Sequence, residues 1–213
     1  MEYSLFDENE NNKIICGTDE AGRGPLAGPV VAAAVVLPSD FPFELLNDSK
    51  KLNEANRLKA EAVIKEKAIA YAISGISHEE IDRINILQAS LLGMKKSYEK
   101  VKDMTHVDIL LCDGNKTPNV DCPVEAIVKG DSKVPEIMAA SILAKNERDR
   151  IMDEYAVKYP GYGFEKHKGY PTKAHLEKIK EFYAPLMDNK GSNLKAVGAP
   201  SLDLLKEQKK SNL

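Results

Sequence analysis

Short apolar runs alternate with longer amphipathic segments along the chain. Five of the apolar segments have the length and composition of buried strands. These strands are expected at residues 13–18, 30–37, 68–76, 107–112 and 124–128. The Ala content of residues 68–76 also leaves a helix open there. Four segments have helical spacing, and these helices are expected at residues 53–67, 78–100, 134–159 and 172–182.

The order of these segments predicts the fold class. Strands interleaved with helices come first and helices dominate the end, which predicts an α/β domain with a mixed sheet flanked by helices. Ser77 is expected to cap the helix at 78–100, with Glu80 three places on as in a capping box. Residues 161–171 are rich in Gly and Tyr and are expected to form a loop.

Length and composition indicate one domain. The chain has 213 residues, 43% of them hydrophobic, and a net charge of −3. That acidic total argues against a protein that binds nucleic acid over its whole surface, but it leaves room for a local basic patch. Cys16, Cys112 and Cys122 form no CxxC pair, so we expect reduced thiols rather than a disulfide or a zinc site.

We expect a cytoplasmic protein with no membrane contact. The first twelve residues lack the basic and apolar regions of a signal peptide. The longest apolar stretch, residues 30–37, is far too short to cross a bilayer. Nothing in the sequence indicates more than a monomer.

Four acidic residues follow expected strands, where acids are uncommon. Asp19 and Glu20 follow the first strand, Asp113 follows the fourth, and Asp131 comes shortly after the fifth. Functional groups of open α/β sheets gather at strand ends, and acids held together there need a cation or shared protons. Oxygen ligands without a Cys/His set favour Mg²⁺ or Mn²⁺. A pair of such ions is a common device for phosphodiester cleavage.

Structural roles explain some of the same acids. Asp113 before Gly114 is a routine turn former, and Asp131 is a possible helix cap with Ser132 as a rival. On a strand, Asp19 and Glu20 would point to opposite faces, so both reach one metal cluster only if the strand bends or ends there. Spacing alone leaves a metal site and structural roles equally open.

Residues 21–29 form a loop of three Gly and two Pro, with sequence AGRGPLAGP. Gly22, Arg23 and Gly24 would place backbone N–H groups and a guanidinium beside the acids, where they could hold a phosphate or a sugar hydroxyl. The segment is neither a Walker loop nor a GxGxxG helix opening. The alternative is an ordinary wide hairpin.

The segment from Thr18 to Val30 resembles the signature of ribonuclease HII. The resemblance continues over roughly residues 13–185 through five further motifs in the family's order. These motifs are DSKKL at 48–52, DGN at 113–115, KGD at 129–131, AASILAK at 139–145 and HKGYPT at 167–172. The Gly22-Arg23-Gly24 version distinguishes the chain from the related ribonuclease HIII, which carries Gly-Thr-Gly there and a large N-terminal extension that is not expected here.

The resemblance implies an RNase H-like fold, with a five-stranded mixed sheet flanked by helices and a small helical C-terminal part. The catalytic domain would occupy residues 1–185, followed by a tail at 186–213 that is partly helical, near 202–209, or disordered. The implied activity is cleavage of RNA in RNA–DNA hybrids, and 5′ of a ribonucleotide embedded in duplex DNA, leaving a 3′-hydroxyl and a 5′-phosphate.

The resemblance also implies roles for single residues. The metal-binding and catalytic acids would be Asp19, Glu20, Asp113 and Asp131, holding two Mg²⁺ or Mn²⁺ ions. The residues that recognise the ribonucleotide would be Gly22, Arg23, Gly24 and Tyr170. Since only the 2′-hydroxyl distinguishes RNA from DNA at one position, a Gly loop and a stacking Tyr suit this task.

Basic residues interleaved with aromatics at 158–180 are expected to contact the duplex. The loop with Lys166, His167 and Lys168 is the better candidate, whereas the lysines of the following helix fit a solvated face equally well. Lys50 is a candidate phosphate contact. Lys145 is expected near the acids, as a phosphate contact or as their salt-bridge partner. His175 is expected on the surface or in packing rather than in catalysis.

The chain departs from the family pattern in two places. Residues 146–149 read Asn-Glu-Arg-Asp where the family usually has Val-Thr-Arg-Asp. We expect these positions to be exposed on a helix, with little effect. The region after Leu176 lacks the basic run of many members, which puts in doubt how the C-terminal part binds the flanking DNA and leaves the four acids untouched.

Three alternatives stay open. A junction resolvase of the same superfamily would share the acids without the Gly22-Arg23-Gly24 and Tyr170 pairing. A non-catalytic hybrid-binding protein would be expected to lose at least one acid, and this chain has all four. A nucleotide-binding domain would use the Gly loop as a phosphate cradle, which the motif spacing disfavours.

Overall fold

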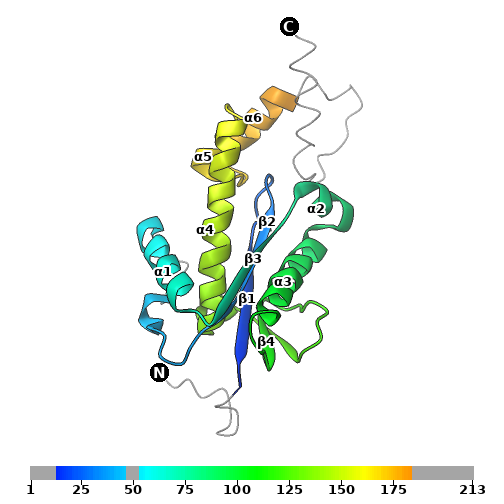
Figure 1. Cartoon of the computed structure of the whole chain (residues 1–213). Helices are drawn as coiled ribbons and strands as arrows, with labels where there is room; N and C mark the ends of the chain where they lie inside the picture. Colours follow the sequence, from blue (N-terminus) through cyan, green and yellow to red (C-terminus); the bar gives the residue numbers. More distant parts are fainter. Residues whose placement is uncertain (1–12, 47–52, 184–213) are drawn as a thin grey trace.

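A computed structural model describes residues 13–46 and 53–183 of the chain (Figure 1). Two of the predictions lie outside the described residues: the phosphate contact Lys50 and the helix near 202–209. No helix in the described ranges is long and apolar enough to span a membrane.

The strands form one five-stranded mixed sheet, as predicted. They are β1 (Ile15–Ala21), β2 (Val30–Val36), β3 (Ala70–Ile76), β4 (Ile109–Asp113) and β5 (Val124–Ile127). Their order across the sheet is β3-β2-β1-β4-β5. β1 pairs antiparallel with β2, and β2 with β3, whereas β1 pairs parallel with β4, and β4 with β5. The Ala-rich third segment is therefore a strand.

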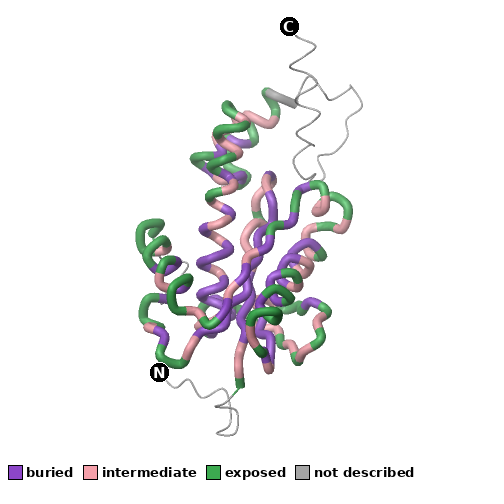
Figure 2. The backbone as a smooth tube through the Cα atoms, viewed as in Figure 1, coloured by how far each residue is buried: buried purple, intermediate pink, exposed green. Residues whose placement is uncertain are grey.

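Helices cover both faces of the sheet (Figure 1). The alternate residues Ala33 and Val35 of β2 pack with α1 (Glu54–Lys67) and α4 (Pro135–Lys158). Their neighbours Ala32 and Ala34 pack with α3 (Ile86–Lys102) on the other face. Because side chains alternate along a strand, a strand covered on both faces must be apolar at every position. Figure 2 shows this buried centre between exposed outer surfaces.

The predicted helix at 78–100 is wrong as a single element. It is divided into α2 (His78–Ile84) and α3, and Asn85 between them has φ = 71°. Its ψ of 164° places it in a conformation that glycine adopts most readily, so the surrounding contacts must hold it there. The Asn85 side chain supplies such contacts by accepting hydrogen bonds from the backbone N–H groups of Leu87 and Gln88. The predicted cap at Ser77 is confirmed, since its side chain accepts from the Glu80 N–H.

Short helices interrupt segments that we expected to be loops. The segment 161–171 contains one helical turn, α5 (Phe164–His167), before α6 (Lys173–Tyr183). Two 3₁₀ turns, η2 (Phe43–Leu46) and η3 (Gly130–Ser132), were also not predicted. Single turns like these carry too few residues for a periodic pattern.

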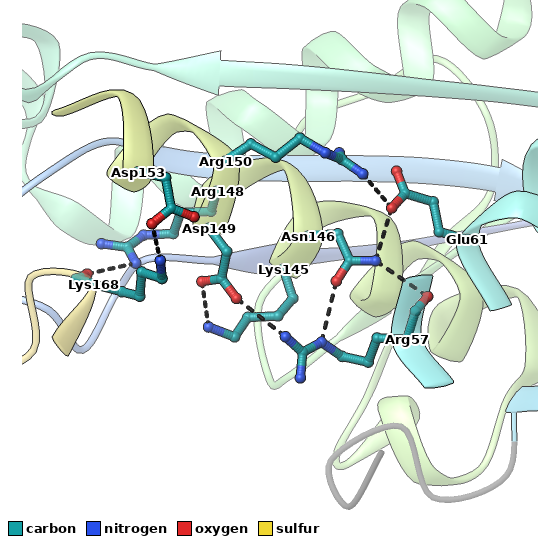
Figure 3. Close-up of polar contacts among 9 residues, drawn as sticks. All are labelled: Arg57, Glu61, Lys145, Asn146, Arg148, Asp149, Arg150, Asp153 and Lys168. Carbon is teal, nitrogen blue, oxygen red and sulfur yellow. Dashed lines mark hydrogen bonds and ion pairs between the residues drawn. The ribbon is translucent and has the colours of Figure 1, made fainter. Parts of the chain in front are cut away.

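The expectation that residues 146–149 are exposed is wrong. Asn146 and Arg148 are almost completely buried. The Asn146 amide donates to Glu61 Oε2 at 2.9 Å and to the Arg57 carbonyl at 3.2 Å, which joins α4 to α1 (Figure 3). A polar residue on a helix looks exposed in sequence, and only a neighbouring helix with matching hydrogen-bond groups buries it.

Two smaller predictions are confirmed. Cys16, Cys112 and Cys122 are free thiols. His175 is buried in packing, where its ring stacks on that of His167 with centroids 4.3 Å apart.

Candidate active site

Parallel pairing brings the acids to one edge of the sheet. Thr18 of β1 pairs with Cys112 of β4, so Asp19 and Asp113 come next on neighbouring strands that run in the same direction. Asp131 lies in η3, just after β5, and its backbone N–H donates to Asp113 Oδ1 at 3.3 Å. Asp113 therefore lies between the acid of β1 and the acid of η3.

Asp19 is buried among other acids. Its residue surface is 5% exposed. Burial raises the pKa of the Asp19 carboxyl well above its usual range, and the charges of Glu20 and Asp113 raise it further. Hydrogen bonds from Ser141 and from the Glu20 N–H oppose this rise in pKa, the latter at 2.7 Å to Asp19 Oδ1. The ionised form of Asp19 is thus costly unless a positive charge is near.

Glu20 lies in the same environment but has a cationic partner. Burial raises the pKa of its carboxyl, Arg23 opposes the rise, and Asp113 adds to it. Arg23 Nη1 lies 3.3 Å from Glu20 Oε1. β1 stays paired with β2 through Ala21, so the strand does not end at these acids. Both Asp19 and Glu20 still interact with the charge of Asp113.

The donor chemistry of these acids fits a divalent cation. Among the described residues, no three His, Cys, Asp or Glu side chains converge closely enough to hold a metal ion in this arrangement. The acids nevertheless present only oxygen, which suits Mg²⁺ or Mn²⁺ rather than zinc. A cation beside Asp113 would also relieve the repulsion that raises the pKa of Asp19 and Glu20.

A cleft of about 380 Å³ joins one of these acids to the Gly loop. It is lined by Glu20, Ala21, Gly22, Arg23, Gly24, Arg57, Ser141, Ile142, Lys145 and Tyr170. The structure therefore brings together the expected ribonucleotide-binding residues and Glu20 in one cleft. Asp19 is buried behind this surface, next to Ser141.

The Gly loop is a hairpin between β1 and β2, with its glycines in close contact with other segments. Gly22 has φ = 119°, and a Cβ there would lie 2.5 Å from the Pro29 carbonyl oxygen. A Cβ on Gly24 would lie 3.5 Å from Cε1 of Tyr170, whose residue surface is 43% exposed. The Tyr170 ring thus lies against the loop and still presents surface to a ligand.

The predicted lysines differ in their placement. Lys145 lines the cleft, but its ammonium pairs with Asp149 at 2.6 Å, not with the four acids. Lys168 pairs with Asp153 and does not line the cleft (Figure 3). His167, from the same expected contact loop, is buried with Nε2 2.9 Å from the Tyr162 carbonyl.

Two residues of the cleft were not predicted. Ser141 belongs to the motif at 139–145, but no role was assigned to it. Arg57 donates to Asn146 Oδ1 at 3.1 Å and to Asp149 Oδ2 at 3.2 Å, so α1 contributes a guanidinium to the cleft (Figure 3). The helical pattern of α1 gave no signal that its single arginine faces the site.

Comparisons with known proteins agree on one family. The family model described as Ribonuclease HII matches residues 16–190. Ribonuclease HII of Nitrosomonas europaea is 53% identical over 171 residues, which cover 80% of this chain and 78% of that protein. Ribonuclease HII of Vibrio parahaemolyticus is 49% identical over 181 residues, 85% of each protein.

Solved structures confirm the RNase H-like fold. The structure of the PCNA:RNase HII complex from Archaeoglobus fulgidus matches with a TM-score of 0.66 and 25% identity, over 88% of this chain and 94% of the solved one. Bst-RNase HIII in complex with Mn²⁺ matches with a TM-score of 0.59 and 19% identity, over 68% of this chain and 55% of that one. With the acids, the Gly loop and the match at residues 16–190 in agreement, this chain belongs to the ribonuclease HII family.

Proposed function

We propose that the cleft between the Gly loop, Tyr170 and the acids is where this chain cuts RNA–DNA hybrids and DNA duplexes that contain a ribonucleotide. The chain is a ribonuclease H endonuclease by family, and the family is metal-dependent. The proposal adds the site and its residues, a cut 5′ of the ribonucleotide, and a 3′-hydroxyl and a 5′-phosphate as products.

The observation that carries this proposal is the shared cleft. Gly22, Gly24 and Tyr170 lie with Glu20 in one hollow, next to the edge of the sheet where Asp19 and Asp113 meet. Recognition of a sugar and cleavage of its phosphodiester require these two kinds of groups within a nucleotide of each other.

We assign the metal-binding role to Asp19, Glu20, Asp113 and Asp131, for two Mg²⁺ or Mn²⁺ ions. Bound there, such ions would supply an activated water and neutralise charge on the leaving oxygen. The protein's own contribution is to carry these acids at one edge of the sheet, where Asp19 and Asp113 follow neighbouring parallel strands and the Asp131 N–H donates to Asp113. In this partly buried place charge interactions are stronger than in water. Ser141 helps by bonding to Asp19, which orients that carboxylate.

The Gly loop and Tyr170 account for selection of the ribonucleotide. Backbone N–H groups of Gly22 and Gly24 can approach a 2′-hydroxyl because no Cβ stands in front of them. Tyr170 offers a ring for stacking and a hydroxyl for a local hydrogen bond. Lys145, Lys168 and Lys50 remain candidate phosphate contacts, and Arg57 joins Arg23 and Lys145 as a third cation that lines the cleft.

The same proposal treats the protein as a cytoplasmic monomer, with residues 1–185 as the catalytic domain and 186–213 as a tail. The resolvase and binder alternatives are not favoured by any specific contact in the described residues. A four-way junction without ribonucleotides serves as a substrate that would reveal the resolvase.

The test is cleavage of a labelled DNA duplex that carries one ribonucleotide, with Mg²⁺ and beside an all-DNA duplex. The unaltered protein should cut once, 5′ of the ribonucleotide, and should leave the all-DNA duplex intact. Asp113→Asn should lower the rate at least about 100-fold, because it removes a metal-binding charge between the other acids. Asp40→Asn is the matched control, since Asp40 is exposed beyond the far end of β2, and it should keep full activity.

Two results would contradict the proposal. Cutting by Asp113→Asn at the rate of the unaltered protein would remove Asp113 from the site. No cutting of this duplex or of a long hybrid, with Mn²⁺ also tried, would favour the non-catalytic binder.

A further inference from the structure

Arg148 is the largest completely buried side chain of polar character in the described chain, and the proposed mechanism does not use it. Its residue surface is 1% exposed, in the second half of α4. Burial lowers the pKa of its guanidinium from the usual value. A buried charge of this kind is costly and is retained where its hydrogen bonds hold something in place.

The guanidinium of Arg148 bonds to two separate loops. Its Nε donates to the Pro29 carbonyl at 3.1 Å and its Nη2 to the Ala27 carbonyl at 3.0 Å, both at the end of the Gly loop. Its Nη1 donates to the Lys168 carbonyl at 3.0 Å, two residues before Tyr170 (Figure 3). In the described part of the chain Arg148 forms no ion pair, so backbone carbonyls are its hydrogen-bond partners.

The two loops also contact each other directly at this point. The Leu26 N–H donates to the Gly169 carbonyl at 2.9 Å. A Cβ on Gly169 would lie 2.4 Å from the Ala27 carbonyl oxygen, and a Cβ on Gly22 would lie 2.8 Å from Arg148 Nε. The joint between the loops is therefore packed to contact, with Arg148 at its centre.

The backbone of the Tyr170 loop is strained where it meets Arg148. Lys168 has φ = 48° and Gly169 has φ = 85°, two left-handed residues in succession. A left-handed conformation is unfavourable for a non-glycine residue such as Lys168, so the surrounding contacts must hold it. Arg148 supplies such a contact by donating a hydrogen bond to the Lys168 carbonyl.

We propose that Arg148 is a positioning residue that sets the separation between the Gly22–Gly24 loop and the Tyr170 ring. This inference rests on the proposed function, in which those two groups read the ribonucleotide. Arg148 does not line the cleft, and its hydrogen bonds go to backbone carbonyls and not to the four acids. Its three hydrogen bonds fix the distance across which a sugar must fit, and its guanidinium carbon also lies 6.0 Å from the centre of the Tyr170 ring.

Only the planar guanidinium of an arginine, with donors on three nitrogens, can bond to these three carbonyls at once. Lys carries the same charge but concentrates its donors at one point, so it cannot reach three carbonyls spread over two loops. Arg148→Lys should therefore lower the single-turnover cleavage rate of the one-ribonucleotide duplex by about 10–100-fold, as misplaced contacts do. The duplex concentration for half-maximal rate should change by less than threefold, because the phosphate-contact residues are left in place.

Arg150→Lys is the matched control. Arg150 lies two residues further along α4, but it pairs with Glu61 and Glu147 and not with the loops. This variant should cleave at the rate of the unaltered protein. Thermal unfolding of both variants would show how much of any loss comes from unfolded protein.

Combining Arg148→Lys with Tyr170→Ala distinguishes a positioning role of Arg148 from a general effect of Arg148 on stability. If Arg148 acts through the placement of the Tyr170 ring, Arg148→Lys should lower the single-turnover cleavage rate less than about threefold in a protein that already carries Tyr170→Ala. The same loss in both backgrounds would overturn the inference, and so would an Arg148→Lys rate equal to that of Arg150→Lys. If Arg148→Lys does not fold, Gly169→Ala disturbs the same joint from the loop side, and the same coupling decides the question. An unaltered protein that cuts no ribonucleotide would overturn the proposed function and this inference together.

Discussion

Gly17 lies in the middle of β1, where the backbone of α4 passes directly over the strand. A Cβ at this position would lie 2.3 Å from the Glu136 carbonyl carbon and 2.4 Å from the Ile137 nitrogen. Contacts of a real Cβ below 3.0 Å essentially never occur, so Gly17→Ala must move α4 away from β1. The obstacle is helix backbone, which cannot turn aside as a flexible side chain would.

The cost of this substitution follows from the contact. Overpacking a well-packed core costs about 1–3 kcal/mol, and a backbone obstacle places Gly17→Ala at the upper end. Replacing Gly in a strand by Ala also stabilises the folded state by roughly 0.5–1 kcal/mol, because it lowers the conformational entropy of the unfolded chain. The free energy of unfolding should therefore fall by about 2 kcal/mol, which for a chain of this length lowers Tm by about 4–8 °C.

The same displacement should affect cleavage, because α4 carries Ser141, which bonds to Asp19, and Lys145, which lines the cleft. Chemical denaturation measures the stability, and single-turnover cleavage at a temperature where the protein is folded measures the site. Gly75→Ala in β3 is the matched control, since no atom lies within 4 Å of a Cβ there, and it should change stability by less than about 0.5 kcal/mol. Equal stabilities for the two variants would refute the claim that β1 and α4 are in backbone contact.

Substitutions at two further positions test other features of the fold. Asn85→Ala should lower the free energy of unfolding by about 1–2 kcal/mol, because it removes the side-chain cap of α3 and keeps a Cβ at φ = 71° and ψ = 164°. Asn85→Gly loses the same cap but relieves the backbone strain, so it should lose less. Equal losses in urea denaturation would show that the break between α2 and α3 does not depend on the backbone conformation of Asn85. Burial first, and then the charge of His167, lower the pKa of the His175 imidazole from its ordinary value of 6.5. Because the unfolded chain then binds more protons, stability should fall as pH drops below about 6.5, and relative to a His175→Phe variant the unaltered protein should lose stability between about pH 7.5 and 5.5. Parallel pH curves for the two proteins would contradict this.

Much of the local structure could be predicted from the sequence. Apolar runs at helix or strand length placed all five strands and the main helices, and the Ser77 cap was correct. The motifs around Asp19, Asp113 and Tyr170 identified the family before any contact was known. Local patterns suffice for these features because strand periodicity, capping and motif spacing act over a few residues.

Other features depended on the tertiary structure. The sheet order places β1 beside β4, nearly a hundred residues later in the chain, and only this pairing brings Asp19 next to Asp113. The burial of Arg148 could not be predicted from α4 alone, because the carbonyls that receive its hydrogen bonds come from two distant loops. The sequence by itself determined the elements and the chemical groups. The tertiary structure decided which of these groups meet, because a polar side chain is buried or exposed according to partners that its own segment does not contain.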